Sequence, residues 1–273
     1  MQFKTLLLAA LGTTTALAGP MGHGLAARVA TRTQRSSQPL SRVGEAAAES
    51  VEGPLADSNV THVQYSSNWA GAVYEEPPSG TFTAVSATIT VPVPSATAAG
   101  TYSASAWVGI DGDTCGNAIL QTGVDFTATK SGSRTTYSYD AWYEWYPDYA
   151  YDFSLSISAG DVIAMSVTSS SSTRGVAVIE NLTTGKSVSK TITSSYALCG
   201  ENAEWIVEDF ESGGSLVAFA DFGDVLFTGA VAKTNTEGNV GTSGAVLIDI
   251  KQNNKVLTSA SIPSSSEVEV VYE

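Results

Sequence analysis

Short runs of alternating apolar and hydroxyl residues dominate this chain, and they constrain its fold more than any other feature. In Val85-Ser86-Ala87-Thr88-Ile89-Thr90-Val91 the two kinds of side chain take alternate positions. Successive residues of a β-strand point to opposite sides, so this pattern predicts a strand with one apolar face. No comparable stripe of helical period is present, and we therefore expect an all-β protein.

Further strand-like segments follow, separated by short turns. They are residues 102–110, 137–146, 161–168, 176–182, 186–193, 203–210, 215–219, 225–233, 245–251, 255–262 and 267–272. Thr183-Thr184-Gly185 and Gln252-Asn253-Asn254 are typical hairpin turns. About a dozen strands without a linker between them predict one antiparallel sandwich or barrel over residues 60–273.

The first 19 residues have the anatomy of a secretory signal peptide. Lys4 precedes an apolar run at residues 6–11, and Ala16-Leu17-Ala18 supplies the small residues of a cleavage site. This run is too short to span a bilayer, and no later stretch is long enough. We therefore expect a secreted, extracellular protein.

Secretion also sets the redox state and the glycosylation of the chain. Its two cysteines are Cys115 and Cys199, and an even pair in an oxidising compartment predicts one disulfide. Two Asn-X-Thr sequons begin at Asn59 and Asn181. Both are candidate sites of N-glycosylation.

Residues 20–59 differ in composition from the rest of the chain. They contain Arg28, Arg32, Arg35 and Arg42, with no acidic residue between positions 20 and 44. A linker or disordered tail is the simpler interpretation. We favour a removable propeptide, because a basic segment could lie across an acidic groove and block it until acid loosens the contact.

The remaining body, residues 60–273, is strongly acidic. It has eight basic and 23 acidic residues, a net charge of −15. This charge repels phosphates and anionic lipids, so neither nucleic acid nor a membrane is an expected partner. Such a surface approaches neutrality near about pH 4, which limits self-repulsion there and favours a protein that works in an acidic medium. We expect a monomer.

The block Asn202-Ala203-Glu204-Trp205-Ile206-Val207-Glu208-Asp209-Phe210 places carboxylates inside an expected strand. Buried carboxylates cost free energy unless they are paired, hydrogen-bonded or protonated, so this cluster indicates a site. The chain has two histidines, of which His23 lies in the segment expected to be removed and His62 lies near the mature start. This inventory disfavours Ser-His-Asp, Cys-His and multi-histidine metal chemistry, and leaves carboxylates and amides, with no metal or cofactor.

Three other motifs carry weaker signals. Trp107-Val108-Gly109-Ile110-Asp111-Gly112-Asp113 ends in an acidic turn, which is either a tight turn or an incomplete calcium loop. Gln121 is a lone amide among apolar neighbours. Residues 140–151, which include Tyr143, are densely aromatic and either line a groove for an extended peptide or sugar chain, or form a core strand.

Five blocks in order resemble the fungal glutamic peptidases, the eqolisin family. They are Ser67-Asn68-Trp69-Ala70-Gly71-Ala72, Trp107-Val108-Gly109-Ile110-Asp111-Gly112, Ile119-Leu120-Gln121-Thr122-Gly123, Tyr139-Asp140-Ala141-Trp142-Tyr143-Glu144-Trp145 and the acidic block above. The resemblance covers residues 60–273 and implies an antiparallel two-sheet β-sandwich, similar to lectins and glucanases. It also implies a secreted zymogen that matures at low pH and a catalytic pair of Gln121 and Glu204. We find no expendable insert and expect a single mature chain.

Such a pair has the functional groups that amide hydrolysis needs. Glu204 as a carboxylate can take a proton from water and return it to the leaving amine. Gln121 can orient the water through its carbonyl and stabilise the oxyanion through its amide N–H groups. The expected substrates are proteins or peptides, and the protein's own propeptide is an expected intramolecular inhibitor.

Nearby residues offer alternatives and support. Glu208 is expected on the same strand face as Glu204 and could exchange roles with it. Asp125 is four residues after Gln121 and is likewise expected on the same face as Gln121. Trp107, Asp111 and Tyr143 are further supporting or substrate-binding candidates. A glycoside hydrolase that uses Glu204 and Glu208, or a carbohydrate-binding module without catalysis, is the rival hypothesis.

Overall fold

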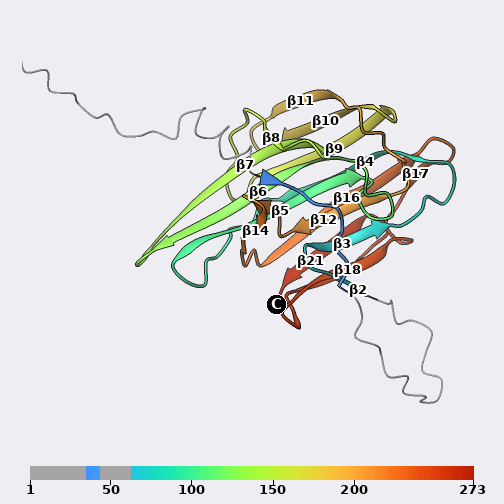
Figure 1. Ribbon diagram of the computed structural model, residues 1–273. Coiled ribbons are helices and arrows are strands. Elements are labelled where there is room, and N and C mark those ends of the chain that lie inside the picture. Colours follow the sequence, from blue (N-terminus) through green and yellow to red (C-terminus); the bar gives the residue numbers. More distant parts are fainter. Residues whose placement is uncertain (1–34, 44–62) are drawn as a thin grey trace, which may run out of the picture.

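The computed structural model describes residues 35–43 and 63–273, and every regular element in these ranges is a β-strand. Two large sheets pack face to face around one apolar core (Figure 1). Almost all neighbouring strands are antiparallel, so the predicted all-β two-sheet sandwich is confirmed. The described residues contain no helix long and apolar enough to cross a membrane.

The larger sheet has ten strands and carries the candidate site. Along its main path the strands are β19 (Lys255–Val256), β18 (Val246–Gln252), β3 (Trp69–Tyr74), β12 (Ala203–Glu208), β5 (Gly100–Ile110), β6 (Ile119–Ser131), β7 (Arg134–Tyr146) and β8 (Tyr151–Asp152). Two short strands add parallel pairings, β2 (Gln64–Ser66) on β18 and β15 (Ala218–Phe219) on β5. Strand β12 is central, because β3 and β5 flank it.

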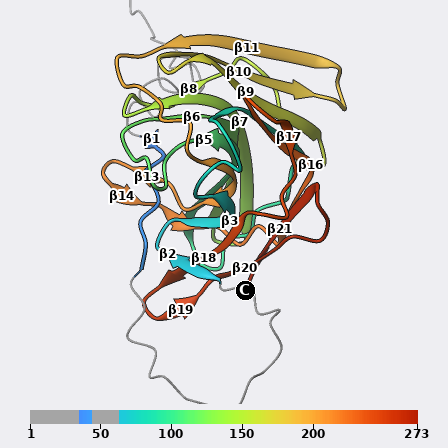
Figure 2. The ribbon, with the colours of Figure 1, turned by 90° about the vertical axis from the view of Figure 1, so that its right-hand side faces the viewer.

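The smaller sheet has eight strands and covers one face of the larger one. Its path is β11 (Lys186–Thr193), β10 (Arg174–Asn181), β9 (Val162–Ser171), β4 (Phe82–Thr90), β16 (Asp224–Thr234), β21 (Glu267–Tyr272) and β20 (Thr258–Ser261), with β17 (Gly238–Val240) paired to β16. A third sheet contains β1 (Arg35–Ser36), β13 (Glu211–Ser212) and β14 (Ser215–Leu216). Figure 2 shows β1 beside β13 and β14, on the side of the sandwich opposite to β16 and β17.

Alternation along each strand decides which side chains enter the main core. In β4 the predicted apolar face is confirmed, because Val85, Ala87 and Ile89 are buried while their hydroxyl neighbours are partly exposed. In β12, Trp205 and Val207 belong to the core between the sheets. Glu204 and Glu208 consequently point to the other face of the larger sheet.

The sequence pattern predicts most strands but misses two central ones, β3 and β6. Every residue of β3 is buried, and so are the first eight of β6. Both faces of these strands are covered, so their sequences lack the alternation that marks a strand with one solvated face. Two predicted strands are also divided: residues 215–219 form β14 and β15, and residues 255–262 contain β19 and β20.

The predicted turns and disulfide are confirmed. Asn253 and Asn254 both have positive φ and connect β18 to β19, as expected for a tight hairpin. Cys115 and Cys199 form the disulfide, which joins the turn after β5 to the loop before β12. The disulfide therefore ties together two segments that lie next to the predicted site.

The sequon at Asn181 is not a surface site. The Asn181 side chain is fully buried, and its Nδ2 donates to Asp161 Oδ2 at 2.8 Å and to Ser156 O at 3.4 Å. Its Oδ1 accepts the Thr184 N–H at 3.0 Å. A glycan on Nδ2 is incompatible with these contacts, which corrects the sequence-based expectation for this position. The other sequon, at Asn59, lies outside the described residues.

We therefore expect folded protein secreted from a glycosylating eukaryotic host to carry no glycan at Asn181. Mass spectrometry of the peptide that contains this residue is the measurement. Asn181→Ala should lower the free energy of unfolding by about 1–3 kcal/mol, since buried partners lose their hydrogen bonds. A fully occupied glycan on natively folded enzyme would contradict this assignment.

Candidate active site

The face of the larger sheet that points away from the main core carries a second apolar cluster, which includes Trp69, Trp107, Trp142 and Ile206. Residues 35–43 lie across this face, with the Leu40 side chain packed on the cluster. In Figure 1 this segment is drawn in blue over the larger sheet. We call this face of the larger sheet, which residues 35–43 cover, the groove.

Strand register arranges the groove side chains in three rows across β12, β5, β6 and β7. The first row is Glu204, Gly109, Gln121 and Glu144, the second is Ile206, Trp107, Gly123 and Trp142, and the third begins with Glu208, Ser105 and Asp125. Two polar rows thus enclose an apolar row. A Cβ at Gly123 would lie 2.5 Å from Trp107 Cβ, so the glycine provides space for the indole.

Gln121 and Glu204 lie in one row with only Gly109 between them. Adjacent strands are spaced by about 4.8 Å, so their backbones stand roughly 10 Å apart. A Cβ at Gly109 would lie 3.3 Å from Glu204 Oε2 and 2.8 Å from Trp107 Cζ3. Both side chains are fully buried, and none of their four head-group atoms has a hydrogen-bond partner among the described residues. The glycine therefore leaves room between two unsatisfied polar groups.

The environment of Glu204 favours its protonated form. Burial is the main cause that raises the pKa of Glu204 well above its usual value, and the charges of Asp111 and Asp113 act in the same direction. A carboxyl group in such a place holds its proton to higher pH and is a stronger base once ionised. It is therefore suited to proton transfer.

Glu208 lies on the same face as Glu204, as predicted, but its carboxylate is engaged. Trp107 Nε1 donates to Glu208 Oε2 at 2.9 Å, and the Gln38 N–H donates to Oε1 at 3.1 Å. Burial raises the pKa of Glu208 to about 7, although the Arg35 charge and the hydrogen bonds oppose this shift. Trp107 and Glu208 thus form a hydrogen-bonded pair beside the unsatisfied head groups of Gln121 and Glu204.

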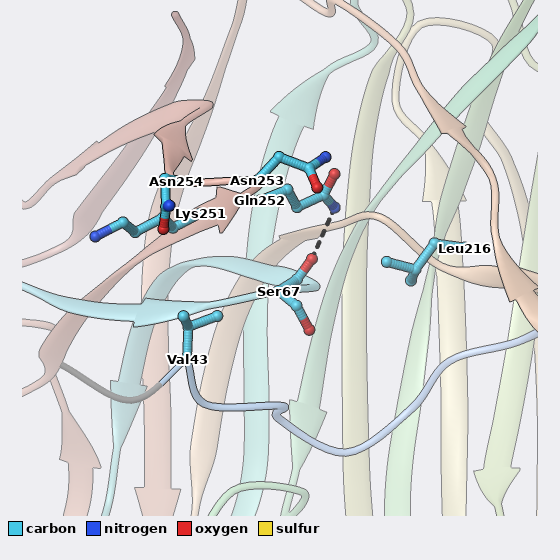
Figure 3. A pocket seen from close by; sticks show the side chains of 7 residues that line it. All are labelled: Val43, Ser67, Leu216, Lys251, Gln252, Asn253 and Asn254. Carbon is cyan, nitrogen blue, oxygen red and sulfur yellow. Dashed lines mark hydrogen bonds between the residues drawn. The ribbon is translucent and has the colours of Figure 1, made fainter. Parts of the chain in front are cut away.

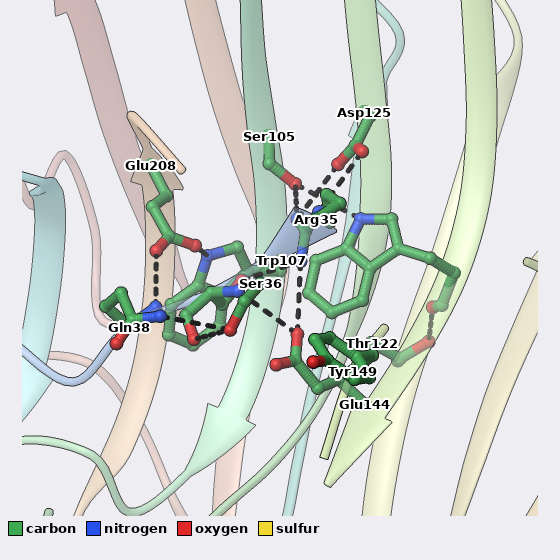
Figure 4. A network of polar contacts seen from close by, with 12 residues as sticks. Arg35, Ser36, Gln38, Ser105, Trp107, Thr122, Asp125, Glu144, Tyr149 and Glu208 are labelled. Carbon is green, nitrogen blue, oxygen red and sulfur yellow. Dashed lines mark hydrogen bonds and ion pairs between the residues drawn. The ribbon is translucent and has the colours of Figure 1, made fainter. Parts of the chain in front are cut away.

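Arg35 enters the groove from the covering segment and binds two buried carboxylates. Its guanidinium forms ion pairs with Asp125 at 3.0 Å and with Glu144 at 3.1 Å (Figure 4). It also donates to Ser105 Oγ at 3.2 Å and to Ser37 Oγ at 2.8 Å. Only 3% of Arg35 is exposed, so these ion pairs are shielded from water and salt.

Aromatic rings complete the Arg35 pocket. The guanidinium carbon lies 3.9 Å from the Trp142 ring centroid and 4.6 Å from that of Phe210. Asp125 is a candidate from its sequence position, whereas Glu144, which the register places opposite Gln121, is not. Strand alternation could have identified Glu144, because it is two residues from Trp142 in an expected strand and therefore lies on the same face.

Asp111 is a structural anchor. Its carboxylate accepts four backbone N–H groups, those of residues 199–202, at 2.8–3.2 Å. It has a φ of 68° and lies directly after β5. Asp111 therefore fixes the loop that leads into β12 and Glu204. Because N–H donors surround its oxygens, the calcium-loop interpretation of this turn is not supported.

Asp209 lies beyond the end of β12 and faces another part of the surface. Its Oδ2 accepts Gln252 Nε2 at 2.7 Å, and the same amide nitrogen donates to Ser67 O at 2.8 Å. Figure 3 shows Gln252 and Ser67 at a hollow of about 440 Å³, which Val43 and Leu216 also line. Burial raises the pKa of Asp209 to about 7.

Tyr143 is the one predicted site residue that does not face the groove. It stacks on Tyr151 with ring centroids 5.7 Å apart and contacts Phe153 at 4.8 Å. Its neighbours Trp142 and Glu144 point into the groove instead, because side chains alternate along β7. A supporting or substrate-binding role for Tyr143 stays a prediction, and the structure places this ring on the face of β7 opposite to the groove.

The groove continues from Arg35 along the long strands β5, β6 and β7. A hollow of about 760 Å³ lies there, and more than half of the residues that line it carry a hydroxyl group. The hydroxyl-bearing lining residues are Thr101, Ser103, Thr127, Thr129, Thr136, Tyr137, Ser138 and Ser212. Thr127 and Thr129 of β6 and Thr136 of β7 thus contribute to this extension.

Comparisons with known proteins agree on one family. A family model described as the peptidase A4 family matches residues 67–272. The chain is 47% identical to aspergillopepsin-2 from Aspergillus niger over 295 residues, with all of both chains covered. Scytalido-glutamic peptidase, solved with a peptide-based transition-state analogue, is similar with a TM-score of 0.67 and 43% identity over 76% of this chain and 98% of that one. SCP-B, described as an eqolisin and solved with the tripeptide Ala-Ile-His, gives a TM-score of 0.64 and 42% identity over 76% and 98%.

Buried carboxyl groups should make this fold more stable in acid than at neutral pH. The pKa values of Glu208 and Asp209 are raised to about 7 and that of Asp249 to about 6, with burial as the main cause. A raised folded-state pKa gives stability that is fully present below the unfolded value and is lost as pH rises towards the folded value. We expect the Tm at pH 4 to exceed that at pH 7 by on the order of 5 °C, measured by circular dichroism.

Asp249→Asn tests the contribution of one buried carboxyl group outside the groove to the pH dependence of the Tm. Asp249 Oδ1 accepts Thr258 Oγ1 and the Ala260 N–H, bonds that an asparagine oxygen can retain. The variant should lose a measurable part of the difference between pH 4 and pH 7. Asp224→Asn, at an exposed strand position, is the matched control. An unchanged difference in Asp249→Asn would exclude this carboxyl as a contributor.

Proposed function

Because this chain belongs to the peptidase A4 family, the glutamic peptidases called eqolisins, and is therefore a peptide hydrolase, we propose that Glu204 and Gln121 are its catalytic pair. The main support is their position, buried in one row with only Gly109 between them and with unsatisfied head groups. A peptide segment of the same chain already lies over this groove. Family membership favours a peptidase over the glycoside hydrolase and the carbohydrate-binding module.

The proposed reaction divides the work between one titrating and one neutral group. Ionised Glu204 removes a proton from the attacking water and then donates it to the leaving nitrogen. Gln121 accepts a hydrogen bond from the water and donates to the oxygen that becomes negative in the transition state. The raised pKa of Glu204 suits its second role, because the protonated carboxyl remains available as an acid. The enzyme acts in acid, where the leaving amine is readily protonated and the ionised fraction of Glu204 begins the reaction.

Residues 20–59 form the propeptide in this proposal, after a signal peptide at residues 1–19 that directs secretion. The described part, residues 35–43, supports this role through its contacts in the groove. The Ser37 N–H donates to Glu144 Oε2 at 3.3 Å, and the Leu40 N–H donates to Gly112 O at 2.9 Å. Neither catalytic head group bonds to the segment among the described residues. The segment therefore excludes substrate without being held by the catalytic pair.

Acid opens this inhibited state by weakening charge pairs. Arg35 binds Asp125 and Glu144, and Arg42 binds Glu75 at 2.8 Å and Asp113 at 2.7 Å. Protonation of the carboxylates removes their charge while arginine keeps its own. The propeptide is then retained less strongly, and the catalytic pair can remove it.

Substitution of either catalytic residue should abolish digestion of protein substrates at acidic pH. We expect Glu204→Gln and Gln121→Ala to lower kcat by at least about 10³-fold, since proton transfer or oxyanion stabilisation is lost. Turnover of a quenched fluorescent peptide is the measurement, with circular dichroism to verify the fold. Glu201→Gln, at an exposed position two residues before β12 begins, should remain active. Full activity of either catalytic variant would refute the pair.

Arg35→Gln should release the inhibition of the precursor at higher pH than in the unmodified protein. Loss of one partner of a buried ion pair costs about 3–5 kcal/mol, so the segment should dissociate far more readily. Processing is followed by mass spectrometry across pH 2–7. Arg42→Gln is the control, because Arg42 is 40% exposed and its ion pairs contribute less. Equal processing profiles for both variants would contradict a special role for Arg35.

A further inference from the structure

The sequence block at residues 67–72 has no role in the catalytic pair, yet its first residues are rigidly arranged. Ser66 Oγ accepts the N–H groups of Asn68 and Trp69 at 3.1 and 3.0 Å. The same hydroxyl donates to Asn68 Oδ1 at 2.8 Å. All three residues are at most 2% exposed. The turn therefore fixes the Asn68 and Trp69 side chains at the edge of the groove.

These two side chains bind the main chain of the covering segment. Trp69 Nε1 donates to Gln38 O at 3.0 Å. Asn68 Nδ2 donates to Pro39 O at 3.2 Å and Gln38 O at 3.4 Å, while its Oδ1 accepts the Ser41 N–H at 2.9 Å. Asn68 thus uses both its donor and its acceptor on backbone groups.

Glu208 completes the arrangement from the neighbouring strand. It pairs with Trp69 in the register of β12 and β3, and its Oε1 accepts the Gln38 N–H at 3.1 Å. Trp107 holds the other oxygen of this carboxylate at 2.9 Å. Enzyme side chains therefore bind both main-chain polar groups of Gln38. The Gln38 side chain is not used, because its Nε2 donates to Ser36 of the same segment.

We propose that Asn68, Trp69 and Glu208 form the binding site for the main chain of the peptide substrate. The inference rests on the proposed function, in which substrate takes the place of residues 35–43 in the groove. The site binds one residue at its N–H and its C=O and the next residue at its C=O. It therefore orients peptides of many sequences, because it contacts groups that all peptides share.

Buried polar groups explain why this site needs a peptide. When the segment leaves, the donors of Asn68 and Trp69 and one Glu208 oxygen lose their partners in a largely apolar groove. A substrate backbone restores these bonds. The bonds form in the bound substrate and persist through the reaction, so their removal weakens binding more than it slows chemistry.

Trp69→Phe tests the site, with Trp145→Phe as the matched control. Each change removes one indole N–H bonded at 3.0 Å to a backbone carbonyl, but Trp145 binds Tyr196 O and belongs to the main core. For three fluorogenic peptides of different sequence, we expect Trp69→Phe to raise KM about tenfold in each, with kcat within about twofold. An unchanged KM, a change confined to one sequence, or a fall in kcat alone would overturn the proposal.

A chemically modified peptide tests the same site without altering the enzyme. The synthetic peptide of residues 35–43 should inhibit the active enzyme. Replacement of the Ser37–Gln38 amide by an ester removes only the N–H given to Glu208, and should raise the inhibition constant about tenfold. A peptide with Gln38→Leu should inhibit like the original. Equal inhibition by the ester would exclude Glu208 from the site.

The outcomes distinguish this site from the catalytic pair. Activity retained in Glu204→Gln would refute the pair but leave the KM and inhibition results meaningful. Conversely, an inactive Glu204→Gln combined with an unchanged Trp69→Phe would preserve the pair and refute the main-chain site.

Discussion

The structure depends on one central strand, β12, whose two faces meet opposite environments. Trp205 and Val207 enter the core between the sheets, while Glu204 and Glu208 point into the groove. Burial of two carboxyl groups on one short strand is unfavourable unless partners or protons compensate. Glu208 obtains hydrogen bonds from Trp107 and from the covering segment, whereas Glu204 retains a raised pKa. The same constraint thus separates a hydrogen-bonded carboxylate, Glu208, from one whose oxygens have no partner among the described residues, Glu204.

The surrounding fold keeps this strand in place from both ends. Asp111 binds the backbone of residues 199–202 before β12, and the disulfide joins the same loop to the turn after β5. Beyond its other end, the Asp209 N–H donates to Asn68 O at 2.9 Å. The proposed catalytic groups therefore stand on a sheet that is fixed at both ends of β12, and such positioning is what reactions with little tolerance for displacement require.

The carboxylates of the groove bind the segment of residues 35–43 that covers it. Asp125 and Glu144 lie in the two polar rows, and together they surround the Arg35 guanidinium. Trp142 and Phe210 exclude water from this contact. A body with excess acidic residues and a segment with excess arginine thus attract each other. In the proposed function this contact is strong near neutrality and weakens in acid, when its carboxylates are protonated.

Local sequence determined the all-β class, the disulfide and the position of Glu204 and Glu208 on one strand face, because strand alternation and residue inventory are local properties. The choice of Gln121 came from the resemblance of five ordered sequence blocks to the eqolisin family. Local sequence did not predict β3 and β6, since strands buried on both faces lose their alternation. Only the tertiary structure decided that Gly109 separates Gln121 from Glu204, that Glu144 joins Asp125 around Arg35 and that Tyr143 points away. These facts depend on register between strands far apart in the chain, where a shift of one residue would turn every side chain to the opposite face.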